Sequence, residues 1–153
     1  MTFQILMMKK SILILASIIL FGCSGDDNNR NNCNFLFDAG VNLTVNTNLP
    51  QFNQLQFAGN GVYVPNQGNN GIWLWRLNSS ILYAWDAADP SHEPSACSTL
   101  EAAETADIVV CGCDDGNQYS LSTGQAFGQN TQPCTLQIYR VDAIGNNTFL
   151  VTN

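Results

Sequence analysis

The side chains best suited to chemistry lie in the segment Cys111-Gly112-Cys113-Asp114-Asp115, and the chain has a single histidine, His92. Thiolate sulfur and imidazole nitrogen bind transition metals, whereas carboxylate oxygens suit hard cations such as Ca²⁺. The spacing therefore allows a metal site. A mononuclear zinc or iron site of this kind would consist of His92, Cys111, Cys113 and Asp114.

Simpler interpretations of the same residues are favoured. An Asp-Asp-Gly sequence after a strand is typical of a turn whose carboxylates accept hydrogen bonds from backbone N–H groups. We interpret Asp114 and Asp115 as turn residues rather than as a calcium site, and His92, beside Glu93, as an exposed loop histidine. One histidine does not favour a Ser-His-Asp triad, and no glycine run opens a helix that would bind phosphate.

The elements that must position these residues are short strands. Gly, Asn, Pro and Ser interrupt the apolar runs at intervals of about 8–12 residues, which is typical of an antiparallel sandwich or barrel. The expected strands cover 41–45, 55–57, 62–64, 72–77, 81–85, 108–111, 118–121, 124–127, 136–141 and 149–151. The one indication of a helix is at 99–105, and a turn is expected at 142–147.

Three tryptophans, Trp73, Trp75 and Trp85, raise the question of a sugar-binding surface. Trp73 and Trp75 are two residues apart on one expected strand, so their side chains share a face. Aromatic side chains pack well on a pleated sheet. We expect core or cross-strand packing, and an exposed glycan- or nutrient-binding surface is the alternative.

The first residues have the pattern of a lipoprotein signal peptide. Lys9 and Lys10 precede an apolar run at 11–20, which is shorter than the roughly 20 residues that span a bilayer. Leu20-Phe21-Gly22-Cys23 then reads as a lipobox. We expect a signal peptide at 1–22, a lipidated Cys23, an Asn- and Asp-rich tether at 23–33 and one domain at 34–153.

A lipidated Cys23 would anchor the domain in the cell envelope, and we expect the outer membrane of a Gram-negative bacterium. Asp26 and Asp27 resemble the surface-export signals of some lipoproteins, with an inner-leaflet location as the alternative. Removal of 1–22 takes away two lysines and leaves three basic residues against twelve acidic ones, a net charge of −9. This charge argues against nucleic-acid partners.

A series of motifs follows in one order along the chain. They are Tyr83-Ala84-Trp85-Asp86, Asp89-Pro90-Ser91-His92, Cys111-Gly112-Cys113-Asp114, Ser122-Thr123-Gly124 and a strand over 133–141. From about residue 33 to 153 this order resembles the Rieske iron–sulfur family, and the lipobox and 95–100 resemble a group of Rieske-like outer-membrane lipoproteins. The resemblance implies an all-β, Rieske-like (ISP-type) antiparallel β-sandwich or barrel with a small subdomain of two cluster-binding-type loops.

The resemblance also implies where the ligands of a [2Fe–2S] cluster would be. A Rieske centre uses two cysteine thiolates and two histidine nitrogens. The equivalent positions here are Asp89, Ser91, Cys111 and Asp114. Cys111 alone keeps a suitable ligand, and His92 is one residue past the expected place as a possible displaced ligand. We therefore expect no bound cluster.

The six cysteines include five in the exported domain if Cys23 is lipidated. The resemblance implies a disulfide between Cys97 and Cys113 that joins the two loops, and Cys111 is a competing partner for Cys97. Disulfides persist in exported proteins. Cys33 and Cys134 are expected to form a second bridge.

Two functions from different classes remain open. The first is a non-catalytic, envelope-anchored lipoprotein whose Rieske-like domain is a structural or interaction module for an unknown protein partner, without cofactor. The alternative is a [2Fe–2S] electron-transfer protein or oxidoreductase subunit. The chain shows no complete catalytic or cluster-ligand set, so the first is favoured.

Overall fold

A computed structural model describes residues 33–128 and 134–153. The predicted signal peptide at 1–22, the lipidated Cys23 and the tether up to residue 32 lie outside the described residues, so they stay predictions. Among the described residues, none of the helical segments has the length and hydropathy of a transmembrane span.

Six strands form an antiparallel sheet in the order β1-β10-β9-β4-β3-β2. These strands are β1 (Asn42–Asn46), β2 (Asn60–Val64), β3 (Ile72–Arg76), β4 (Leu82–Asp86), β9 (Ile138–Gly145) and β10 (Thr148–Thr152). Four shorter strands form a second antiparallel sheet in the order β5-β6-β7-β8. They are β5 (Leu100–Ala102), β6 (Ile108–Cys111), β7 (Gln118–Ser120) and β8 (Ala126–Phe127).

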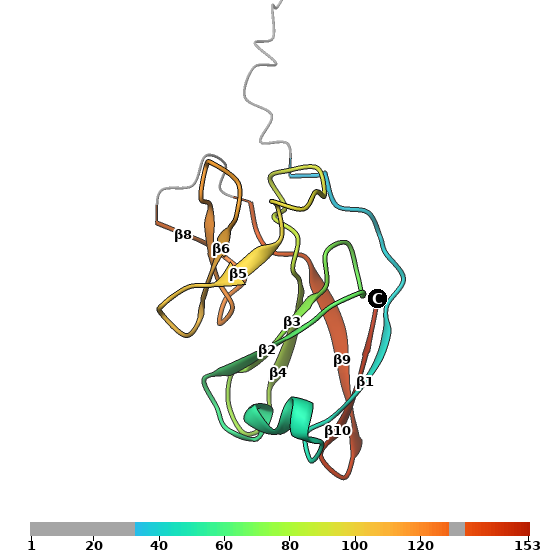
Figure 1. Cartoon of the computed structure of the whole chain (residues 1–153). Coiled ribbons are helices and arrows are strands. Elements are labelled where there is room, and N and C mark those ends of the chain that lie inside the picture. The colour runs from blue at the N-terminus through green and yellow to red at the C-terminus, as the bar shows by residue number, and fades with distance from the viewer. Residues whose placement is uncertain (1–32, 129–133) are drawn as a thin grey trace, which may run out of the picture. The chain divides into compact units, whose positions relative to one another are not determined.

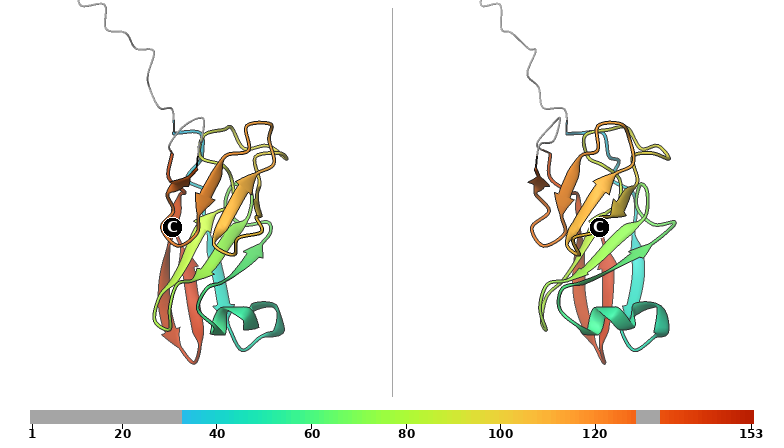
Figure 2. Two further views of the ribbon diagram at one scale, coloured as in Figure 1. Left: turned by 90° about the vertical axis from the view of Figure 1, so that its left-hand side faces the viewer. Right: turned by 60° about the vertical axis from the view of Figure 1, so that its left-hand side comes forward.

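The four-stranded sheet lies against one end of the six-stranded sheet, and the chain enters it after β4 and leaves it before β9 (Figures 1 and 2). The predicted all-β class, with antiparallel sheets and a small subdomain that carries two loops, is confirmed by this architecture.

The central strands β3 and β4 separate two apolar cores by the alternation of their side chains. On one face, Leu74 and Ala84 pack with side chains of β1, β9 and β10 and of the 3₁₀ helix η2 (Pro50–Gln56). On the other face, Trp75 and Trp85 pack against the small sheet through residues such as Leu121. The small sheet therefore packs against one face of the β3–β4 pair.

The tryptophans are used for this packing. Trp75 and Trp85 are 3% and 6% exposed. The indole N–H of Trp85 donates to the Leu121 carbonyl at 2.8 Å, and that of Trp73 donates to the Leu100 carbonyl at 2.9 Å. The indoles thus tie the large sheet to the small one, as the packing interpretation requires, rather than forming an exposed platform.

Three local expectations were wrong. The expected strand at 55–57 is instead the end of η2, because Pro50 begins a helical turn and Phe52 and Leu55, three residues apart, share its buried side. The helix indicated at 99–105 contains β5, because pairing with β6 outweighs local helix propensity. The turn expected at 142–147 is shorter, because β9 continues to Gly145 and two left-handed asparagines, Asn146 and Asn147, close the hairpin.

Candidate functional site

Two loops meet at the end of the small sheet. The first loop, 87–99, follows β4, and the second, 112–117, follows β6. A disulfide between Cys97 and Cys113, with Cα atoms 4.9 Å apart, joins them. This is the pair that the resemblance implies, and Cys111 is the free cysteine among the residues that the structure describes.

A second disulfide joins Cys33 to Cys134 across 101 residues of sequence. It ties the beginning of the described chain to the segment that leads into β9, close to the first loop. Pro90 of that loop lines a surface pocket together with Cys33 and Leu136. The expected second bridge is therefore also formed in the structure.

Asp89 lies near the beginning of the first loop and is fully buried. Its Oδ1 accepts hydrogen bonds from the Ser91 hydroxyl and the Tyr119 phenol, both at 2.6 Å, and from the Ser91 backbone N–H at 2.8 Å. Its Oδ2 accepts one from the Asn117 amide at 3.1 Å. Burial by itself would raise the pKa of Asp89, but these hydrogen bonds outweigh it and lower the pKa below its usual value.

Tyr119 and Asn117 are the donors that the sequence analysis missed. Both are fully buried, and they flank Gln118, the first residue of β7, so their side chains lie on the same, inner face. Burial raises the pKa of the Tyr119 hydroxyl, and its hydrogen bond to Asp89 raises it further. The available signal was the spacing of Asn117, Tyr119 and Leu121, which puts two polar groups on an otherwise buried face.

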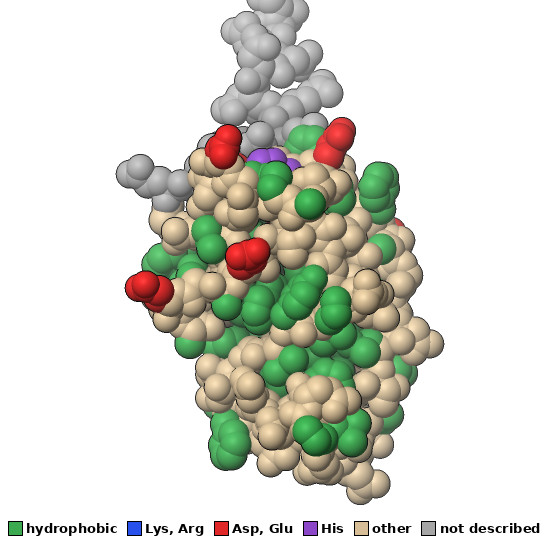
Figure 3. All heavy atoms as spheres, in the orientation of Figure 1, with side chains coloured by type: hydrophobic (Ala, Val, Ile, Leu, Met, Phe, Trp, Pro, Cys, Tyr) green, Lys and Arg blue, Asp and Glu red, His purple; other side chains and the backbone are tan. Residues whose placement is uncertain are grey.

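His92 is not the exposed loop histidine that was expected. Its Nε2 lies 2.9 Å from Asp115 Oδ2 and 3.5 Å from Asp89 Oδ2, and its side chain is 28% exposed. The first loop turns back at Asp89, whose carbonyl accepts the His92 N–H at 3.3 Å. This turn directs His92 towards the second loop, and its purple side chain is only partly visible in Figure 3.

In the second loop, Asp115 faces the first loop, whereas Asp114 was the residue expected to do so. Gly116 N–H donates to the Cys113 carbonyl at 3.0 Å, which closes a four-residue turn as expected. Asp114 is exposed on this turn, whereas Asp115 is half-buried beside His92. Of the four cluster-ligand-equivalent positions, the structure brings Asp89, Ser91 and Cys111 together and leaves Asp114 on the surface.

Cys111 ends β6 beneath this turn and is 3% exposed. Burial raises the pKa of its thiol to about 12, although the Cys113 N–H, 3.5 Å from the sulfur, acts in the opposite direction and Asp89 adds to the rise. The thiol is therefore protonated at neutral pH and points its S–H at the Cys97 carbonyl, 3.7 Å away.

Four of these side chains form a compact group. Asp89, His92, Cys111 and Asp115 each offer one ligand atom, and these atoms all lie within 4.8 Å of one another. A second grouping of His92, Cys111 and Cys113 is less useful, because the Cys113 sulfur is already in a disulfide. The group therefore differs from the site that the sequence suggested, since Asp89 and Asp115 take the places of Cys113 and Asp114.

The donors present do not fit a [2Fe–2S] cluster. That cluster needs two thiolates and two imidazoles, and the two loops offer one thiol and one imidazole. At the remaining positions, Asp89 offers a carboxylate oxygen and Ser91 a hydroxyl that donates to Asp89, and neither is a thiolate or an imidazole. We therefore derive no electron-transfer step through this site.

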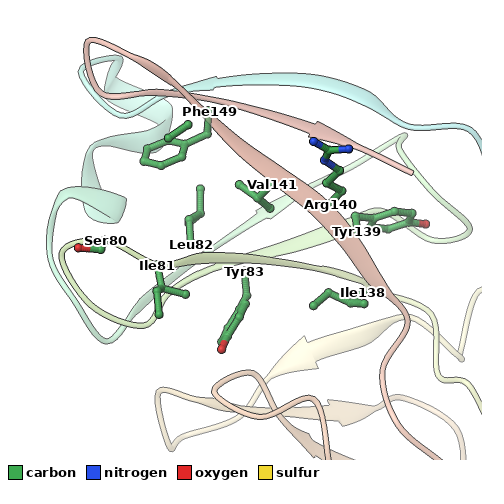
Figure 4. A pocket seen from close by; sticks show the side chains of 10 residues that line it. Ser80, Ile81, Leu82, Tyr83, Ile138, Tyr139, Arg140, Val141 and Phe149 are labelled. Atoms are coloured by element: carbon green, nitrogen blue, oxygen red, sulfur yellow. The ribbon is translucent and has the colours of Figure 1, made fainter.

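A shallow apolar groove lies away from the two loops, on β4, β9 and β10 (Figure 4). Tyr83 and Ile138 lie on one side of β4, and Phe149 lies on the other side with Leu82. Ile138 is 57% exposed. The groove contains no cysteine, histidine or carboxylate, so it does not add to the chemistry of the site.

No family model matches the sequence, and no curated protein matches it. Among solved structures, the complex of reduced oxygenase and oxidized ferredoxin in carbazole 1,9a-dioxygenase is 15% identical with a TM-score of 0.44, over 76% of this chain and 94% of that chain. A provisionally assigned NADPH nitrite reductase small subunit is 20% identical with a TM-score of 0.39, over 71% and 97% of the respective chains. Both similarities are too low to support a function.

Proposed function

We propose that this chain is a lipoprotein of the cell envelope, anchored through Cys23, whose Rieske-like domain acts without a [2Fe–2S] cluster as a structural or interaction module for a protein partner. Four features support it: the lipobox, the order of the Rieske-type motifs, the disulfide that joins the two loops, and the donor set between them.

The observation that carries the proposal is the buried network around Asp89. A Rieske-type loop needs a thiolate at this place, whereas here a carboxylate is held by Ser91, Tyr119 and Asn117. A hydrogen-bonded buried carboxylate contributes to stability, and breaking such a network is costly. The loops are therefore held together by protein groups, in a place where the family uses an inorganic cluster.

The test is to purify the lipidated chain in detergent from iron-replete cells, and to reconstitute a second sample anaerobically with iron and sulfide. We expect a colourless protein with less than about 0.1 iron per chain, since one thiol and one imidazole supply half of the ligands. Stoichiometric iron and acid-labile sulfide, with visible absorbance that bleaches on reduction, would refute the proposal.

The anchor is tested separately. Cys23→Ala should abolish labelling by a radioactive fatty acid and release the chain from the membrane fraction, because the acyl chains supply the membrane affinity. Ser24→Ala, one residue away, is the matched control and should keep both. Equal labelling of the two variants would exclude Cys23 as the lipidated residue.

A further inference from the structure

The group formed by Asp89, His92, Cys111 and Asp115 has the dimensions of a metal site. Its four ligand atoms lie within 4.8 Å of one another, and His92 Nε2 is 2.9 and 3.5 Å from the two carboxylate oxygens. In a tetrahedral zinc site with bonds of about 2.0–2.3 Å, the ligand atoms are roughly 3.3–3.8 Å apart. Adjustments of about an ångström would bring these atoms to that spacing.

The histidine nitrogen gives independent support for a ligand at this place. His92 Nε2 is a buried atom that makes no hydrogen bond within the described residues, although Asp115 Oδ2 is within ion-pair distance. A buried ring nitrogen that lies near two carboxylate oxygens without hydrogen-bond geometry is only partly compensated, and the remainder is a cost. A metal ion that accepts its lone pair would remove this cost.

The surrounding groups already hold the carboxylates in place. Ser91 and Tyr119 occupy Oδ1 of Asp89, which leaves Oδ2 as the oxygen that faces His92. The Asn117 amide nitrogen lies 3.1 Å from Asp89 Oδ2 and 2.6 Å from Asp115 Oδ2. Such hydrogen bonds to ligand atoms orient the ligands of natural metal sites.

We propose that Asp89, His92, Cys111 and Asp115 bind one Zn²⁺ ion as a closed structural site that joins the two loops. Zinc accepts sulfur, nitrogen and oxygen ligands in one tetrahedral set, whereas Ca²⁺ takes six to eight oxygens. On binding, a Zn–S bond replaces the S–H bond of Cys111 and the proton passes to water. One thiolate, two carboxylates and a neutral imidazole leave a local charge of −1 around the ion.

This inference goes beyond the proposed function, because a zinc-loaded domain still has no iron–sulfur cluster. The zinc site and the proposed function can be refuted independently of each other. Iron and acid-labile sulfide would refute the proposed function whatever happens with zinc. A protein that binds neither an iron–sulfur cluster nor zinc would refute the zinc site and leave the proposed function standing.

The experiment uses the lipidated full chain in detergent, treated with EDTA and then titrated with Zn²⁺ by calorimetry and with Co²⁺ by absorption. We expect one ion per chain and a thiolate-to-cobalt charge-transfer band, because Cys111 supplies the single sulfur ligand. Saturation without that band, or no saturable binding, would overturn the proposal.

Variants then identify the ligands. Asp115→Asn should weaken zinc binding at least 10-fold, and His92→Ala at least 100-fold. Cys111→Ser, which keeps the side-chain size, should abolish the cobalt–thiolate band. Asp114→Asn is the matched control, since Asp114 is adjacent but exposed, and its zinc affinity should stay within 2-fold. Near-ultraviolet circular dichroism of the metal-free variants checks folding, and equal affinities for the Asp114 and Asp115 variants would overturn the site.

Discussion

At the scale of single residues, Asp89 shows how a buried charge can be tolerated. It is fully buried, but its two oxygens accept four hydrogen bonds, from the Ser91 hydroxyl and N–H, the Tyr119 phenol and the Asn117 amide. Its pKa is lowered because these donors favour the ionised form more than burial disfavours it. The carboxylate is therefore part of the structure of the loop.

Because the pKa of Asp89 is lowered in the folded state, we expect the stability of the protein to depend on pH in the acid range. A lowered pKa in the folded state gives a contribution that is complete above the unfolded value of about 3.9 and is lost as the pH falls through the folded pKa. In EDTA, Asp89→Asn should lower the free energy of unfolding at pH 7 by about 1–3 kcal/mol, because the amide is a poorer acceptor for these four donor groups. The difference in free energy of unfolding between wild type and variant, measured by urea denaturation, should be smaller at pH 3 than at pH 7. A gap that stays constant with pH would contradict this account.

A second prediction at this scale concerns Gly124. Its φ is +72°, and a Cβ there would lie 2.6 Å from the Trp85 ring. Gly124→Ala should therefore cost about 2–4 kcal/mol in the free energy of unfolding, since it adds a clash to backbone strain. Gly59→Ala is the control, because φ is +79° there and nothing lies within 4 Å of a Cβ. Equal losses in the two variants, measured by urea denaturation, would show that contact with Trp85 is unimportant.

At the scale of elements, the sequence predicted the strands whose side chains alternate and missed those that depend on tertiary pairing. The hairpin expected at 72–77 and 81–85 is β3 and β4, because their two faces pack in different cores. β5 has three residues and is fixed by its pairing with β6, which no local pattern reveals. The same limit applies to the site: whether Asp114 or Asp115 faces His92 depends on one turn, and residue types alone do not determine it.

The two disulfides predict different losses of stability. In the chain-entropy model, a cross-link stabilises more when it closes a longer loop, by about 3 kcal/mol for 15 residues and about 4.7 kcal/mol for 100. The Cys97–Cys113 and Cys33–Cys134 bridges span 16 and 101 residues. The double serine variant of Cys33 and Cys134 should therefore lose more stability than that of Cys97 and Cys113. Double variants prevent the thiol left behind from pairing with Cys111, and non-reducing peptide mapping checks the remaining bridge.

At the scale of the whole molecule, a second buried carboxylate joins parts of the chain that are distant in sequence. Asp86 of β4 is fully buried and accepts hydrogen bonds from the Asn69 N–H and side-chain amide, both at 2.8 Å, and from the Tyr139 phenol of β9. Asn69 in turn contacts the backbone of Phe37 near the beginning of the described chain. One carboxylate thus holds the central strands, a surface loop and the N-terminal segment together.

Because of the Tyr139 phenol in this network, we expect the free energy of unfolding to fall at alkaline pH. Burial raises the pKa of Tyr139, and its hydrogen bond to Asp86 adds to the rise. A raised folded pKa gives stability that is complete below the unfolded value of about 10 and is lost as the pH rises through the folded pKa. From about pH 10 upward, this group should reduce the free energy of unfolding by at most about 1.4 kcal/mol per pH unit.

Tyr139→Phe separates this effect from general alkaline damage. The variant should be less stable at pH 8 by about 1–2 kcal/mol, because Asp86 loses a donor. It should also lose stability less steeply than wild type between pH 10 and 11.5, because the ionisable group is gone. Both slopes are measured by urea denaturation in EDTA, which removes any bound metal. If the free energies of unfolding of the two proteins fall in parallel over this range, ionisation of the Tyr139 phenol does not cause the alkaline loss of stability.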